Sequence, residues 1–203
     1  MRIACLGWGS LIWDPRCLRL TKGNRPWHRD GPELPIEFAR QSTEERLTLV
    51  VLEGVPLVKV LWAEMDFACV VDARRDLLRR ESSTGSLDRV TALWRTDDKD
   101  SDDAVVGSVG TWARGKDIDA VVWTKLGPNF DGVPGKIPTV KDASSYLSAL
   151  VDAGHAKSAE EYVRKTPLQI TTPYRRTIEE LFGWTYDGTA TDSQIADDGS
   201  KAD

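Results

Sequence analysis

Strand-like and helix-like patterns are separated along this chain, and this separation limits the folds that the chain can adopt. Short apolar or alternating runs bounded by turn residues are typical of strands. They occur at residues 2–6, 35–41, 47–53, 57–63, 90–95, 105–113 and 118–125. One helical pattern, at residues 66–81, lies among them, and three more follow residue 140. This order argues against regular alternation of strands and helices and predicts an α+β fold.

Three helices after residue 140 are predicted from the residues that flank them. Ser, Thr and Asp favour the N-cap, Gly the position after the last turn, and Pro the first turn or the residues beyond the end. The first predicted helix has Asp142 as its N-cap and ends at Gly154. The second begins at Ser158, in a capping box with Glu161, and stops near Pro167. The third has Thr172 as its N-cap, Pro173 in its first turn, and Gly183 after its end. A segment between strands, residues 96–103, is strongly acidic and is expected to be a solvated hairpin loop.

The chain length and the charge distribution indicate a single domain followed by a tail. A chain of 203 residues can bury one substantial core, and we expect the domain to span residues 1–184. Residues 185–203 carry −4 of the net charge of −5 and have few apolar side chains. Such a composition is typical of disorder, so the tail is predicted to be disordered.

The composition argues against several classes of protein and site. The three cysteines, Cys5, Cys17 and Cys69, are widely spaced, and His28 and His155 are the only histidines, so neither a disulfide framework nor a metal site is expected. The sequence contains no basic stripe and no apolar run of about 20 residues, so neither a nucleic-acid partner nor a membrane span is expected. No signal-peptide pattern precedes the first strand, which favours the cytoplasm. The oligomeric state is left open.

The first predicted strand ends in a turn that contains two glycines. The segment reads ACLGWGSLIWDP from residue 4, so that Gly7, Gly9 and Ser10 are flanked by Trp8 and Trp13. Glycine lets a ligand approach the backbone closely, and successive N–H groups can hold an anion. A tight turn wrapped by core aromatic residues is the other interpretation. The pattern is neither a P-loop nor a dinucleotide fingerprint.

The helical pattern at residues 66–81 ends in a carboxylate. Val70, Leu77 and Leu78 follow helical spacing, and Glu81 continues the same face. A carboxylate at the inward end of an apolar stripe is poorly solvated, and it lies where the helix dipole disfavours negative charge, which suits a general base. The alternative is a surface carboxylate paired with Arg79 or Arg80.

These segments together resemble the gamma-glutamylcyclotransferase family, and most closely its ChaC branch. LGWGSLIW at residues 6–13 is similar to the family's first glycine-serine motif, with Trp8 in place of a tyrosine. FARQSTEER at residues 38–46 and LLRRE at residues 77–81 resemble the stretches that follow, the second of them ending in the family's catalytic glutamate. The resemblance continues through WTKLGPNF at residues 123–130 and the helical segment from residue 142, and covers roughly residues 2–165.

The resemblance implies a fold, a reaction and a set of site residues. The fold would be a small mixed β-barrel with flanking helices and a cavity at the barrel mouth. The reaction would cyclise a γ-glutamyl amide or peptide, such as glutathione, to 5-oxoproline and release an amine, with no metal or cofactor. Glu81 would be the general base, and the substrate-binding residues would be Gly7, Trp8, Gly9, Ser10, Leu11, Arg40 and Ser42. Arg46 is a further candidate anchor for a carboxylate.

Two other functions are compatible with the same residues. The change from tyrosine to Trp8 allows a non-catalytic module that binds a small molecule in the same cavity. An interaction protein that recruits partners through its acidic tail is the other possibility. Ser42 and the two arginines, Arg40 and Arg46, could equally be turn or surface residues.

Overall fold

The computed structural model shows an α+β fold with two mixed sheets, and it describes residues 1–21, 25–81, 85–98 and 101–196. The first sheet has the strand order β2-β6-β1-β8-β7. Its strands are β1 (Ile3–Gly7), β2 (Trp27–His28), β6 (Leu61–Met65), β7 (Thr91–Arg95) and β8 (Ala120–Thr124). β1 is central, antiparallel to β6 and parallel to β8, and every one of its residues is buried. The α+β prediction is therefore confirmed.

The second sheet is built around one long strand. β3 (Glu33–Ser42) pairs with β4 (Arg46–Val51), β5 (Leu57–Lys59) and β9 (Asn129–Phe130), and β10 (Val133–Pro134) pairs with β9. The predicted strand at residues 57–63 is in fact two strands, because the chain passes from the second sheet to the first at Val60. In the described residues the two sheets do not close into a barrel, so the predicted β-barrel is corrected to two open sheets.

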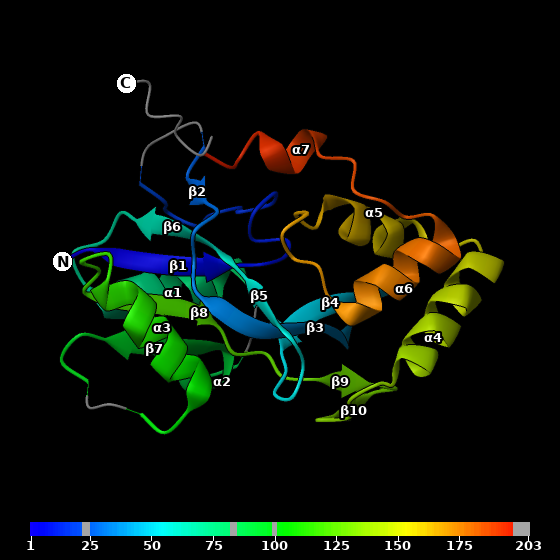
Figure 1. Ribbon diagram of the computed structural model, residues 1–203, viewed down its shortest axis with the longest axis horizontal. Coiled ribbons are helices and arrows are strands. Elements are labelled where there is room, and N and C mark those ends of the chain that lie inside the picture. The colour runs from blue at the N-terminus through cyan, green and yellow to red at the C-terminus, as the bar shows by residue number, and fades with distance from the viewer. Residues whose placement is uncertain (22–24, 82–84, 99–100, 197–203) are drawn as a thin grey trace.

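Helices cover the sheets from two sides (Figure 1). α1 (Val70–Arg80), α2 (Leu87–Val90) and α3 (Ala104–Arg114) pack with the strands of the first sheet, and α3 also contacts β3. α4 (Val140–Asp152), α5 (Lys157–Lys165) and α6 (Pro173–Phe182) gather beside the second sheet, where α5 contacts β4 and α6 contacts β3. The short helix α7 (Thr189–Asp192) follows them.

The largest error of sequence interpretation concerns α3. Its valines are β-branched and favour strands, which led to the prediction of a strand at residues 105–113. Asp103, however, accepts hydrogen bonds from the N–H groups of Val105 and Val106 and thereby caps a helix. Val105, Val109 and Ala113 are buried at a spacing of four residues. The preceding acidic segment therefore joins a strand to a helix and is no hairpin loop; residues 99–100 lie outside the described residues.

The predicted helix boundaries hold in one case and shift in the others. α6 has Thr172 as its N-cap and ends at Gly183, whose φ of 66° suits glycine, as predicted. α4 begins earlier than predicted, because Thr139 is the N-cap and Asp142 is the third residue of its capping box. The capping box predicted at Ser158 is wrong, since Ala156 occupies the N-cap of α5 without a side-chain hydrogen bond.

The segment after Thr185 is packed against the domain as far as Ala196. Ile195 is buried and forms a bridge with Trp27, and the Thr191 hydroxyl donates to the Lys165 carbonyl at 2.7 Å. Arg29 forms an ion pair with Asp192. The prediction of a disordered tail is wrong for these residues, because the two buried side chains supply anchors that the polar composition concealed; residues 197–203 lie outside the described residues.

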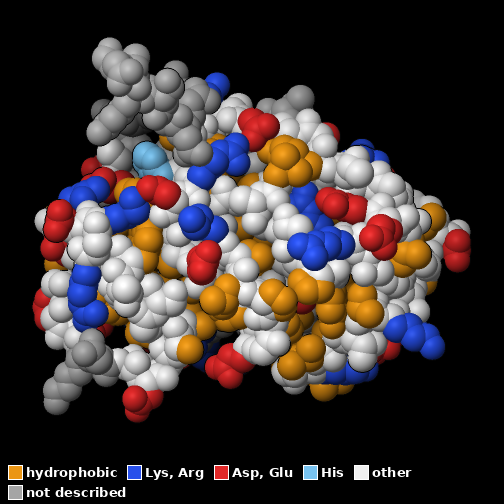
Figure 2. Space-filling view, viewed as in Figure 1, with side chains coloured by type: hydrophobic (Ala, Val, Ile, Leu, Met, Phe, Trp, Pro, Cys, Tyr) orange, Lys and Arg blue, Asp and Glu red, His pale blue; other side chains and the backbone are white. Residues whose placement is uncertain are grey.

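The surface shown in Figure 2 carries charged side chains of both signs, and hydrophobic side chains gather below the centre of this view. Among the helices of the described residues, none is long and apolar enough to cross a membrane.

A buried carboxylate connects β3 to α6. Glu37 is fully buried, and its oxygens accept hydrogen bonds from the Thr172 hydroxyl at 2.5 Å and from the N–H groups of Phe38 and Tyr174 at 2.8 and 3.2 Å. Burial raises the pKa of Glu37 above its ordinary value, and these hydrogen bonds offset only part of the effect. Glu37 thus holds the first turn of α6 against the second sheet.

We expect Glu37→Gln to reveal this raised pKa. The folded chain binds the Glu37 proton more tightly than the unfolded chain does, so wild-type stability falls as the pH rises from the ordinary glutamate value through the raised one. Glutamine does not titrate. The free energy of unfolding of the wild type, minus that of the variant, should be larger at about pH 4.5 than at about pH 7.5. Urea unfolding at both pH values measures it, and a constant difference would contradict the assignment.

Candidate functional site

A cavity of about 200 Å³ lies where β1, the β3–β4 hairpin, the end of α1, the segment after β8 and α5 come together. Most of the residues predicted for the site line it. They are Trp8, Gly9, Ser10, Leu11, Arg40, Ser42 and Glu81. These residues come from three separate segments of the sequence, so the fold brings the predicted site residues together in one place.

Gly7 is the predicted site residue that does not line the cavity. A Cβ atom at this position would lie 2.6 Å from Cζ3 of the buried Trp27 ring. Gly7 is therefore needed for packing between β1 and Trp27, and its prediction as a substrate-binding residue is corrected to a packing role.

Gly9 is needed because a tyrosine hydroxyl lies against its backbone. A Cβ atom on Gly9 would overlap the hydroxyl oxygen of Tyr162 and lie 3.1 Å from its Cζ atom. Tyr162 comes from α5, is buried, and accepts a hydrogen bond from the N–H of Leu49 in β4 at 3.3 Å. Trp13 packs edge-on against the same ring with centroids 5.3 Å apart. Tyr162 lines the cavity and was not predicted from the sequence.

The flanking tryptophans serve two different purposes. Trp8 is buried, lines the cavity, and donates its indole N–H to the Leu49 carbonyl at 3.2 Å. Trp13 supports Tyr162 rather than the cavity itself. Trp8, Gly9 and Trp13 therefore fix the end of β1 between β4 and α5, whereas Gly7 packs against Trp27 of β2.

We expect Gly9→Ala to destabilise the protein through its clash with Tyr162. Overpacking of this kind costs about 1–3 kcal/mol, or roughly 2–12 °C in the melting temperature of a chain of this size. In a Tyr162→Phe background the same substitution should cost less, because the overlapping oxygen is gone. Gly127→Ala is the control, since its Cβ would meet no atom within 4 Å. Additive effects of the two substitutions in thermal melts would contradict the clash.

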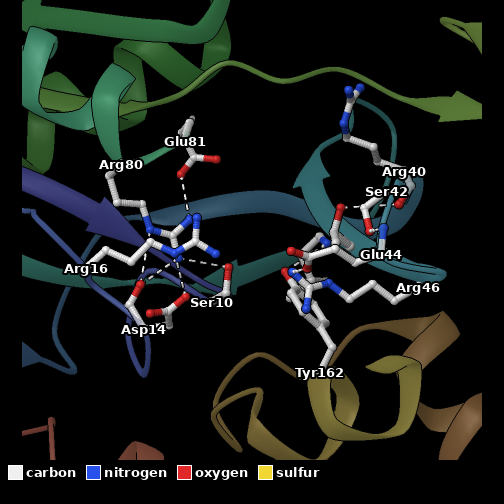
Figure 3. Close-up of polar contacts among 12 residues, drawn as sticks. Ser10, Asp14, Arg16, Arg40, Ser42, Glu44, Arg46, Arg80, Glu81 and Tyr162 are labelled. Carbon is white, nitrogen blue, oxygen red and sulfur yellow. Dashed lines mark hydrogen bonds and ion pairs between the residues drawn. The ribbon is translucent and has the colours of Figure 1, made fainter. Parts of the chain in front are cut away.

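One wall of the cavity is a cluster of hydrogen bonds around Arg80 (Figure 3). Arg80 is buried, and its guanidinium donates to Glu81 Oε1 at 2.9 Å, to the Ser10 hydroxyl at 3.1 Å and to the Asp14 carbonyl at 2.8 Å. The Glu81 side chain is only 13% exposed, and within the described chain its Oε2 atom makes no hydrogen bond. Glu81 is thus a held, largely buried carboxylate with one oxygen free to accept a proton.

The facing wall comes from the β3–β4 turn and α5, and Figure 3 shows it across from Arg80 and Glu81. The N–H of Glu44 donates to the Ser42 hydroxyl at 3.2 Å, so Ser42 both shapes the turn and lines the cavity. Arg46 forms an ion pair with Glu44 and stacks over the Tyr162 ring, 5.1 Å from its centroid.

Arg40 carries the cavity's uncompensated positive charge. Its guanidinium donates to the Gly127 carbonyl at 2.9 Å, and it forms no ion pair with any carboxylate of the described residues. Burial lowers the pKa of Arg40, and the negative charge of Glu81 opposes part of that shift. A carboxylate ligand would stabilise this half-buried cation.

Two further observations limit the chemistry of the cavity. Cys5, on β1, is fully buried, and burial raises the pKa of its thiol to about 12, so it is no thiolate nucleophile at neutral pH. Across the described ranges no group of three or more His, Cys, Asp or Glu side chains is arranged to hold a metal ion.

Comparison of the chain with protein-family models, curated proteins and solved structures finds no match.

Proposed function

We propose that the protein is a gamma-glutamylcyclotransferase-like enzyme that converts a γ-glutamyl amide or peptide to 5-oxoproline and a free amine. The observation that carries the proposal is the position of Glu81, which has a free Oε2 atom and lines the same cavity as the Gly9–Ser10 turn and Arg40. The proposal includes the finer fold assignment, with the two open mixed sheets as a variant of that family's fold, and a cytoplasmic location.

In the proposed reaction both reacting groups belong to one substrate molecule. The α-amine attacks the side-chain carbonyl, the bond to the leaving nitrogen breaks, and a proton passes from the former to the latter. Holding the substrate in a folded conformation removes much of the barrier. Glu81 would accept the proton from the α-amine and deliver it to the leaving nitrogen. No water or redox partner is consumed.

The other residues of the cavity would bind the substrate's charges. Arg40 suits the α-carboxylate, because its guanidinium has no carboxylate partner within the described chain. Within the described residues, the backbone N–H groups of Gly9 and Ser10 donate no hydrogen bond. They can therefore donate hydrogen bonds to an oxyanion. The intramolecular attack needs only one base, so the proposed mechanism uses neither a thiolate nor a metal ion.

The test is formation of 5-oxoproline by the purified protein. We would incubate it with glutathione and a set of γ-glutamyl dipeptides and amides, and detect the product by mass spectrometry. Product from at least one compound supports the proposal. A higher melting temperature with such a compound but no product would favour the non-catalytic binding module, and neither effect, from a folded protein, would refute both.

A further inference from the structure

A second cavity, of about 520 Å³, adjoins the first. It lies between the ends of β4 and β8, strand β7, α2 and the first turn of α3. Thr124 and Leu126 line both cavities, so the end of β8 and the segment that follows it border both spaces. The cyclisation proposed above places no part of the substrate in this second cavity.

The first cavity is too small for a complete γ-glutamyl substrate. Sites for drug-sized ligands occupy roughly 300–1,000 Å³, whereas the cavity beside Glu81 measures about 200 Å³. It suits the γ-glutamyl group, which carries the reacting atoms. The leaving amine would then lie outside this open cavity, and the second cavity, which has more room and shares two lining residues, offers a place for it.

The position of α1 agrees with this direction. The helix lies along both cavities, with Arg74 lining the second and Glu81, just after the last turn, lining the first. Glu81 lines the first cavity together with Thr124 and Leu126, the two shared residues. A leaving nitrogen that takes its proton from Glu81 thus lies in a space that shares two lining residues with the second cavity.

Seven of the side chains that line the second cavity are apolar and five are charged. The apolar ones include Val51, Leu93, Val105, Val106, Trp123 and Leu126. Of its charged residues, Arg74 forms an ion pair with Asp88 at 2.8 Å and Asp103 caps α3, so these groups are engaged within the protein. Glu53 and Lys125 are exposed to solvent. Such a lining favours an apolar group over a charged peptide.

We propose that the second cavity binds the leaving amine and that this amine carries a branched aliphatic or aromatic body. The inference rests on the proposed function and specifies its substrate class: γ-glutamyl amides of apolar amines, in preference to γ-glutamyl peptides with a charged leaving group. Each methylene that enters the cavity would raise kcat/KM about fourfold.

The test compares three substrates with the same γ-glutamyl group: the methylamide, the isobutylamide and γ-glutamylglycine. We expect kcat/KM for the isobutylamide to exceed both others by at least about tenfold. Equal or better turnover of γ-glutamylglycine would overturn the substrate class and leave the cyclisation standing. No 5-oxoproline from any of the three, with glutathione also inactive and the protein folded, would overturn both proposals.

Two variants test whether the selectivity for the leaving amine arises in the second cavity. Val106→Asp introduces a charge into the lining, and the third position of α3 tolerates an acid because it lies in the first helical turn. Ala92→Phe fills the space from β7. The ratio of kcat/KM for the isobutylamide to that for the methylamide should fall toward one in both. Val71→Asp, an exposed site in the first turn of α1, is the matched control. A ratio that stays unchanged in Val106→Asp and Ala92→Phe refutes the assignment.

Discussion

Glu81→Gln is expected to lower kcat for 5-oxoproline formation by about 10²–10⁴-fold while the protein stays folded. A general acid–base residue contributes an effect of that size. Glutamine keeps the shape of the side chain, and its amide oxygen can still accept the hydrogen bond that Arg80 donates to Oε1 at 2.9 Å. What it lacks is a basic oxygen at the position of Oε2, where the α-amine proton would be taken up.

Two controls make the Glu81 result specific. Glu180→Gln, on the exposed side of α6, makes the same chemical change away from the cavity and should leave turnover unaltered. Glu44→Gln tests the cavity's other glutamate, which is half exposed and paired with Arg46. Full activity in Glu81→Gln would falsify the assignment of the base. Loss of activity in Glu44→Gln alone would transfer that role to Glu44.

Periodicity and local motifs predicted the parts of the site that depend on one segment each. The inward face of α1 follows from Val70 and Leu77, and Glu81 continues that face, as the largely buried carboxylate shows. The same spacing also covers residue 80, so Arg80 could have been recognised as buried and was instead considered only as a surface partner. The alternative of a surface ion pair was thus right about the partner and wrong about its exposure.

Contacts between distant segments could not be predicted in this way. Gly9 was expected to be bare for a ligand, yet the atom that excludes a side chain there belongs to Tyr162, more than 150 residues later. Its spacing with Ala159 and Val163 marks Tyr162 as buried, but nothing in the sequence pairs it with the turn. Similarly, the valines of α3 favour a strand locally, and only burial against the sheets shows which pattern prevails.

Arg80→Met is expected to lower the free energy of unfolding by about 3–5 kcal/mol, as is typical when one partner of a buried ion pair is removed. Methionine fills similar space but donates no hydrogen bond. Glu81 would lose its counter-ion, and the Asp14 carbonyl and Ser10 hydroxyl would lose the donor that ties the turn after β1 to the end of α1. Urea unfolding measures the loss, which corresponds to roughly 6–20 °C in melting temperature.

Arg80→Lys separates the charge from the hydrogen-bond geometry. An ammonium keeps the attraction to Glu81 but cannot reach Glu81, Ser10 and Asp14 together, as the planar guanidinium does. We therefore expect a loss between zero and that of Arg80→Met. Arg75→Met is the matched control: the Arg75 side chain is 66% exposed, its partner Asp72 is 55% exposed, and the pair lies outside the cavity, so it should cost clearly less. If Arg80→Met and Arg75→Met destabilise the protein equally, the hydrogen bonds of Arg80 do not hold the wall of this cavity. If only Arg80→Met is severe and Arg80→Lys restores part of the stability, the position of Glu81 depends on the donor fork of Arg80 as well as on its charge.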